Sequence, residues 1–266
     1  MTLRPEFFRL VSYPSSGHQA YQFPVVLLVF ASCVSAAVVP EPALQIFLGT
    51  TPDTLLRNLK VNRPPALNEQ AKAQVIRCLP RDGEVTKLSD SERKKLASLE
   101  PVLRLHGRDA VYVVKVVEVP AAVIALHERS VLLISASGLA LWNAQELQAL
   151  AAHEIAHEYT WEQYQLARSR KESPAMQQLE LYSDGIAILT LAQIGVDPSA
   201  LTSALKKGIR YNRSHLGFAR NEDQYPDFKR RQRFHRAIIE WMSVSSTKRN
   251  ESEQVVSRSA WQASAH

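Results

Sequence analysis

The sequence predicts an α+β domain that is mainly helical and carries a small, largely antiparallel sheet ahead of its longest helices. Three runs rich in Val, Ile and Leu predict the strands, at 109–119, 122–128 and 130–135. Two long helices are predicted after them, at about 144–168 and 173–195. The β-rich runs therefore come before the helical ones, as expected where sheet and helices are segregated along the chain.

Each long helix has a recognisable start. Asn143 is a favourable N-cap, and Glu146 stands three residues later, as a capping box requires. Pro174 suits the first turn of the second helix, and Gly195 is the residue expected to end it. Further helices are predicted at about 51–60, 67–79, 90–106, 197–211 and 226–244.

The composition is that of an ordinary globular protein. The chain has 266 residues, of which 45% are hydrophobic and 22% are charged, enough for one sizeable core or two small ones. If the N-terminal segment with Cys33 is cleaved, Cys78 has no partner, which excludes a disulfide framework and a cysteine-based zinc site. The sequence contains no internal repeat and no glycine-rich phosphate loop.

The N-terminal segment 1–37 differs from the rest. A polar, basic start is followed by the apolar run PVVLLVFASCVSAAVV, which is shorter than the roughly 20 apolar residues of a membrane-spanning helix. Small residues near Ala36 and Ala37 suit signal-peptidase cleavage. We therefore expect a secretory signal and an exported protein, either periplasmic or membrane-anchored. An uncleaved anchor, a buried core segment and lipoprotein cleavage at Cys33 are the alternatives.

The end of the chain carries much of its positive charge. The formal net charge is +6, and the segment FKRRQRFHR at 228–236 holds much of the excess. A solvated helix face is the favoured interpretation, and attraction to an anionic membrane surface stays open. No aromatic-interleaved basic module predicts a nucleic-acid partner. The Ser-rich tail 245–266 is expected to be disordered, which leaves 38–244 as the folded domain.

The stretch AAHEIAHEYTW is the strongest functional signal. His153 and His157 are four residues apart, with Glu154 after the first. Residues four apart lie on one helix face, so both imidazoles can reach one metal ion, and Glu154 can act as general base toward an activated water. The flanking residues are apolar almost all round, which indicates a buried helix whose polar side chains need partners. An exposed face with three polar residues is the alternative.

The third ligand is predicted on the next helix, in ELYSDGIAILTLAQIG. Glu180 and Asp184 are four apart, and no Lys or Arg stands three or four residues from either. Two like charges one turn apart disfavour a helix unless a cation lies against them. We expect Glu180 to bind the metal and Asp184 to accept a hydrogen bond from the far ring nitrogen of His153. A surface Glu and a dipole-stabilised Asp are the alternative.

These motifs together resemble one family. The stretches ALHERSVLLISASGLALWNAQELQALAAHEIAH, ELYSDGIAILTLAQIGVDP and YPDFKRR are similar to segments of the M48 family of gluzincin metallopeptidases, over roughly Ala122 to Arg236. The resemblance implies a zincin-like catalytic domain with one Zn²⁺ per chain. It implies His153, His157 and Glu180 as ligands and Glu154 as the general base.

The sequence departs from the family pattern around the site. Tyr182 replaces a second Glu, and Tyr225 replaces a His. Arg231 matches the family's arginine and shares a helical stripe with apolar residues, so we expect it to point inward. Arg231, Tyr225 and His215 are the candidates for stabilising the oxyanion of the transition state. The resemblance also implies that strand 130–135 lines the cleft and that a substrate peptide adds to its edge, with plain sheet core as the alternative.

The expected function is zinc-dependent hydrolysis of peptide bonds in protein or peptide substrates outside the cytoplasm. The alternative is a zinc-binding protein of the same fold that acts as a chaperone or binding module with little turnover. A membrane-attached structural protein without a metal is the third hypothesis. The intact Glu154 favours the endopeptidase.

Overall fold

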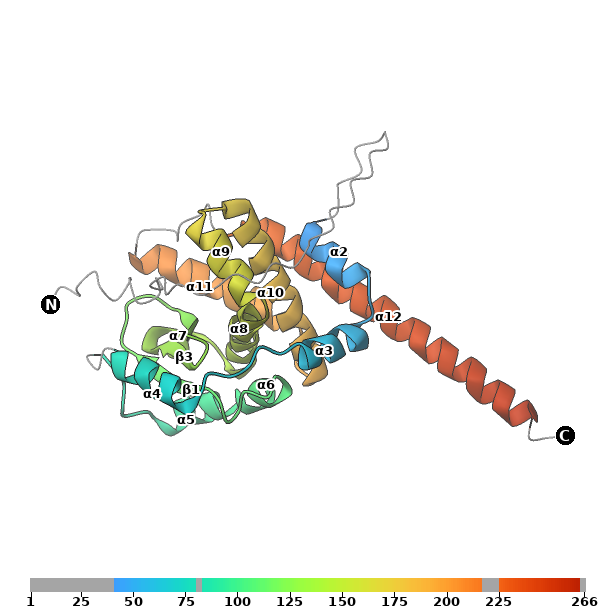
Figure 1. The fold of residues 1–266 in the computed structure, drawn as a ribbon, viewed down its shortest axis with the longest axis horizontal. Coiled ribbons are helices and arrows are strands. Elements are labelled where there is room, and N and C mark those ends of the chain that lie inside the picture. The colour runs from blue at the N-terminus through green and yellow to red at the C-terminus, as the bar shows by residue number, and fades with distance from the viewer. Residues whose placement is uncertain (1–40, 80–82, 217–224, 264–266) are drawn as a thin grey trace. The chain divides into compact units, whose positions relative to one another are not determined.

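The computed structural model describes residues 41–79, 83–216 and 225–263, with side chains as far as 245. Within this part of the chain the protein is mainly helical and has one small sheet, so the α+β class is confirmed (Figure 1). The expected signal or anchor at 1–37 lies outside the described residues. No helix in the described ranges combines the length and hydropathy that crossing a membrane requires.

Short helices precede the sheet. They are α2 (Pro42–Leu48), α3 (Pro52–Val61), α4 (Glu69–Cys78), α5 (Asp90–Ala97) and α6 (Glu100–Leu105). The sequence predicts α5 and α6 as one helix, but the structure separates them at Ser98 and Leu99. Pro101 lies in the first turn of α6, where its missing N–H removes no intrahelical hydrogen bond, so it favours a new helix start.

The sheet is mixed, which corrects the expectation of a largely antiparallel one. Its strand order is β1-β3-β2, with β1 parallel and β2 antiparallel to β3. A tight turn joins β2 to β3, whereas the connection from β1 to β2 contains Pro120 and forms no hairpin. The strands are β1 (Val113–Val117), β2 (Ile124–His127) and β3 (Val131–Ser135).

The position of β3 overturns a second expectation. The segment 130–135 was expected to offer its edge to a substrate, but β3 is central and pairs on both sides. A strand whose backbone groups bond to neighbours on both sides has no edge for a further strand. The edge next to the helices is formed by β2, which contacts α8.

The helices that follow the sheet build most of the core. α8 packs against α10 and α11 (Figure 1) and against β2, and most of its residues are buried, as its apolar sequence predicts. These elements are α7 (Ala136–Leu141), α8 (Ala144–Ala156), the 3₁₀ helix η1 (His157–Thr160), α9 (Trp161–Ser169), α10 (Ser173–Gln193), α11 (Ala200–Leu216) and α12 (Phe228–Ala263).

Further helix boundaries differ from the prediction, and α11 ends at Leu216 instead of about 211. The helix expected at 144–168 is interrupted by η1, because Glu158 and Tyr159 are bonded to groups outside the helix. α12 continues to Ala263, beyond its expected end at Val244 and through most of the tail that was expected to be disordered. Neither glycine nor proline occurs between 228 and 263, so no residue there stops a helix.

α2 packs beside the middle of α10. The Phe47 ring is fully buried among aromatic side chains of α10 and α12. A Cβ at Gly185 would lie only 2.2 Å from Phe47 Cζ, so this close approach requires glycine. Glu41, just before α2, accepts hydrogen bonds from Arg230 (Nε, 2.8 Å) and Gln178 (Nε2, 2.8 Å). The start of the described chain is therefore anchored to α10 and α12.

Candidate metal centre

α8 begins with the predicted capping box. Asn143 Oδ1 accepts a hydrogen bond from the Glu146 N–H (2.9 Å), and Glu146 Oε2 accepts one from the Asn143 N–H (3.0 Å). Ser203 and Lys207 of α11 donate to the same carboxylate, which is buried. The first turn is thereby fixed against α11, and the helix carries His153 near its opposite end.

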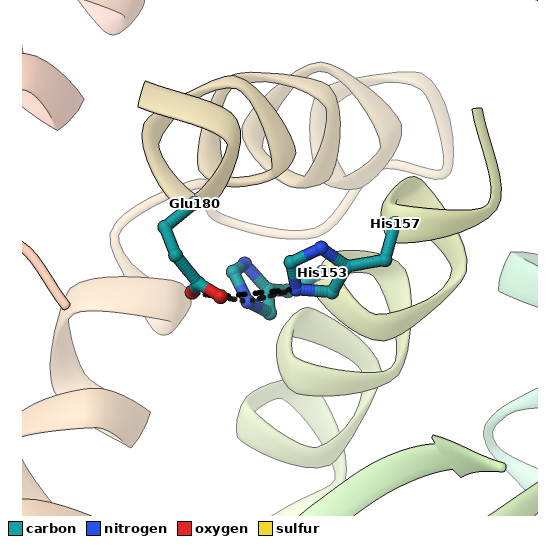
Figure 2. Close-up of side chains that lie close together, drawn as sticks. All are labelled: His153, His157 and Glu180. Atoms are coloured by element: carbon teal, nitrogen blue, oxygen red, sulfur yellow. Dashed lines mark hydrogen bonds and ion pairs between the residues drawn. The ribbon is translucent and has the colours of Figure 1, made fainter. Parts of the chain in front are cut away.

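Three side chains from α8, η1 and α10 converge on one point (Figure 2). The Nε2 atoms of His153 and His157 are 3.1 Å apart. Glu180 places Oε2 at 3.4 Å from His153 Nε2 and Oε1 at 3.6 Å from His157 Nε2. Ligand atoms about 2.1 Å from one tetrahedral ion lie about 3.4 Å from one another. The group can therefore hold a metal ion, with His153 and Glu180 buried and His157 half-buried.

Asp184 lies behind the metal group, as expected. Its Oδ1 is 2.9 Å from His153 Nδ1, the ring nitrogen that does not face the metal position. The two groups form an ion pair when His153 is protonated, but Nδ1 makes no hydrogen bond, so the hydrogen bond expected from His153 to Asp184 is not formed. Arg231 donates to both carboxylate oxygens, from Nε at 2.7 Å and from Nη2. His235 Nε2 lies 2.9 Å from Oδ2. The carboxylate is therefore held on three sides.

The site charges are set by burial and by neighbouring groups. Burial opposes protonation of His153, but Asp184 and Glu180 outweigh it and raise its pKa to about 9. Burial lowers the pKa of His157 to about 4. Burial would raise the pKa of Glu180, yet the histidines and Arg231 lower it to about 2. At neutral pH Glu180 is a carboxylate and His157 a neutral imidazole, which are the forms that bind metals, whereas His153 is protonated in the metal-free site and releases its proton when a metal binds.

Glu154, next in sequence to His153, contacts the sheet. Its Oε2 accepts a hydrogen bond from the Leu126 N–H of β2, at 3.2 Å. Ser135 N–H bonds to Val123 C=O across the β2–β3 ladder. Because bonded and non-bonded positions alternate in an antiparallel pair, Leu126 turns its N–H away from β3. The outer edge of β2 therefore faces the helix that carries Glu154.

The three candidates for oxyanion stabilisation occupy different places. Arg231 points inward, as predicted, and its guanidinium bonds Asp184 and lies 3.9 Å from Glu180 Oε2. Tyr225 is half-buried. His215 is exposed and stacks on the Tyr211 ring of its own helix, with ring centroids 4.0 Å apart.

The sequence interpretation gave no role at the site to three side chains around the ligands. The Tyr164 ring packs on His157, with centroids 5.2 Å apart. Burial raises the pKa of Tyr164, and the nearby acids of the site add to the rise. Ser183 Oγ lies 3.2 Å from His157 Nδ1. His235 could have been identified from the sequence, because it follows Arg231 by one helical turn. Tyr164 could not, because it follows the break at η1, which the sequence does not predict.

No protein-family model matches the sequence, and no curated protein matches it significantly.

Proposed function

We propose that the protein is a zinc-dependent endopeptidase with a gluzincin-type active site like that of the M48 family. The observation that carries the proposal is the convergence of two imidazole nitrogens and one carboxylate oxygen, from His153, His157 and Glu180, beside Glu154. Two histidines and one glutamate, with a further position open for water or substrate, form a ligand set typical of catalytic zinc.

The residues around the ligands each have a chemical task in this proposal. A bound zinc ion would activate water and polarise the scissile carbonyl. Glu154 accepts the proton of the attacking water and delivers it to the leaving amine. Its hydrogen bond to the Leu126 N–H holds the carboxylate against β2. Asp184 holds His153 with Nε2 free to bind the metal.

The substrates proposed are extended segments of unfolded proteins. A peptide strand that replaces Glu154 as the partner of the Leu126 N–H can add to the outer edge of β2 through backbone hydrogen bonds, which do not depend on side-chain identity. This edge faces Glu154, because the Leu126 N–H already bonds its carboxylate. A segment seated there would lie close to the general base. The edge proposed to bind the peptide is therefore that of β2, and not that of segment 130–135 as the sequence resemblance implied.

The proposed location is outside the cytoplasm. The apolar run before residue 40 and the small residues at Ala36 and Ala37 support export. The exposed residues Lys229, Arg233 and Arg236 share one stripe of α12, which supports attraction to an anionic membrane surface.

The test measures zinc per chain and cleavage of an unfolded protein by the wild type, Glu154→Gln and the surface control Glu162→Gln. We expect one zinc in all three proteins, and cleavage about 100-fold slower or more in Glu154→Gln alone. Absence of zinc from the wild type would refute the proposal. Zinc together with binding of unfolded protein, but no cleavage by any variant, would favour the chaperone or binding module.

A further inference from the structure

Glu158 follows the ligand His157 directly and is almost completely buried, with 1% of its surface exposed. Its Oε2 accepts hydrogen bonds from Arg108 Nε (2.7 Å) and the Tyr112 hydroxyl (2.5 Å). Its Oε1 accepts from Arg129 Nε (3.3 Å) and Nη2 (3.2 Å). One carboxylate thus joins η1 to the segment after α6, the start of β1 and the β2–β3 turn.

The two arginines extend the cluster to another segment. Arg108 Nη2 donates to the carbonyl of Pro64 at 2.6 Å, and Arg129 Nη2 donates to that of Pro65 at 2.5 Å. Both prolines lie in the link between α3 and α4. The cluster therefore fixes five chain segments around Glu158.

Arg129 belongs to a turn that needs support. Glu128 and Arg129 have φ angles of +44° and +52°, a left-handed conformation that side chains disfavour. The turn is closed by the Ser130 N–H, which donates to the His127 carbonyl at 3.1 Å. Because this turn ends β2, the bonds from Arg129 to Glu158 also set where β2 lies.

The position of Glu158 links this support to the metal group. In a 3₁₀ helix successive residues differ by about 120° in direction, so His157 and Glu158 point different ways from one rigid turn. A shift of that turn moves the His157 ring. β2, at the other side of the cluster, bears the Leu126 N–H that holds Glu154.

The cluster contains two positive guanidinium groups and one carboxylate in a buried position, which is an inefficient way to stabilise a fold. Two arginines share one carboxylate, and the Arg108 and Glu158 side chains are only 4% and 1% exposed. Buried ion pairs lose much of their attraction to desolvation and are weak sources of net stability. What such a cluster supplies is a fixed relative position of the segments that it joins.

We propose that Glu158 is a positioning residue that sets the ligand turn of His157 and the edge strand β2 relative to each other. The inference rests on the proposed function. It predicts that Glu158 affects zinc affinity through η1 and substrate cleavage through Arg129.

The first test compares zinc affinity, by competition with a chelator, in Glu158→Gln and Glu146→Gln. Glu146 is a matched control, because it is a buried carboxylate of α8 with an ammonium and a hydroxyl partner, at the end away from the metal group. We expect zinc binding to weaken about 10- to 100-fold in Glu158→Gln and to stay within about twofold of the wild type in Glu146→Gln. Equal effects in both variants, or none in Glu158→Gln, overturn the inference.

Two milder variants keep the test decisive if Glu158→Gln does not fold. Tyr112→Phe removes one donor to Glu158 and is expected to weaken zinc binding in the same direction but less. Arg129→Gly keeps the left-handed turn accessible and cuts its bond to Glu158. We expect about tenfold lower kcat/KM on an unfolded substrate, with zinc affinity within about twofold. Wild-type affinity in Tyr112→Phe, or wild-type cleavage in Arg129→Gly, contradicts the inference.

The results also separate this inference from the proposed function. A wild type that binds zinc and cleaves, together with unaffected Glu158→Gln and Arg129→Gly variants, leaves the endopeptidase standing and removes the positioning role. A wild type that binds no zinc refutes both.

Discussion

The substitution Asp184→Asn tests separately two expected effects of the Asp184 carboxylate, on the stability of the fold and on metal binding by His153. Asparagine keeps the size of the side chain and removes its negative charge. Arg231 is 6% exposed and loses its two charge-assisted bonds, which leaves Glu180 at 3.9 Å as its nearest anion. Removing one partner of a buried ion pair costs about 3–5 kcal/mol. We expect the free energy of unfolding of the metal-free protein to fall by about that amount.

The same substitution should weaken zinc binding. Asp184 Oδ1 is 2.9 Å from His153 Nδ1, and loss of such a partner lowers metal affinity about 10- to 100-fold. That range corresponds to about 1.4–2.7 kcal/mol of binding free energy. Urea unfolding without metal and chelator competition with zinc measure the two quantities separately.

The double variant Asp184→Asn with Arg231→Met decides whether the reasoning is correct. Methionine fills much of the space of the arginine stem without a charge, so the unpaired guanidinium disappears. We expect the double variant to regain at least half of the lost stability while zinc binding stays weak. If it is no more stable than Asp184→Asn, the stranded charge is not the cause. Unchanged zinc affinity in the single variant would refute the role of Asp184 at His153.

Other predictions concern packing, pH and the helix start. Gly185→Ala should lower the free energy of unfolding by about 1–3 kcal/mol, because the new Cβ meets the Phe47 ring; wild-type stability in urea would contradict this. Burial lowers the pKa of His106 to about 3 from its ordinary 6.5, so only the unfolded chain takes up its proton below pH 6.5. Stability should therefore fall toward pH 3, by up to about 1.4 kcal/mol per pH unit from this group, and His106→Gln should flatten that slope in urea titrations. Asn143→Ala should cost about 1 kcal/mol through loss of the helix cap, and thermal unfolding checks it.

Much of the site could be predicted because its signals are local. The four-residue spacing of His153 and His157, and of Glu180 and Asp184, sets which side chains share a helix face. The capping box at Asn143 fixes the start of α8 from adjacent residues alone. These features depend on helix geometry and need no knowledge of tertiary contacts.

The unpredicted features depend on partners far away in the sequence. No glycine or proline marks the break after Ala156, and η1 forms because Glu158 meets Arg108 and Arg129. Strand order could not be predicted for the same reason, because a short apolar run does not indicate which other strand it pairs with. Pro120 is a local sign that β1 and β2 are not a hairpin, but it does not predict that β1 pairs with β3.

The packing of α2 limits how far the chain can be shortened from its N-terminus. Cleavage near Ala36 or Ala37 would leave Glu41 and all of α2 in the mature protein. A truncation that removes Phe47 would empty the space beside Gly185, next in sequence to Asp184, and loss of a buried phenylalanine ring costs about 3–5 kcal/mol. A protease that trimmed the chain past α2 would therefore destabilise the fold around Asp184 without reaching the candidate metal ligands.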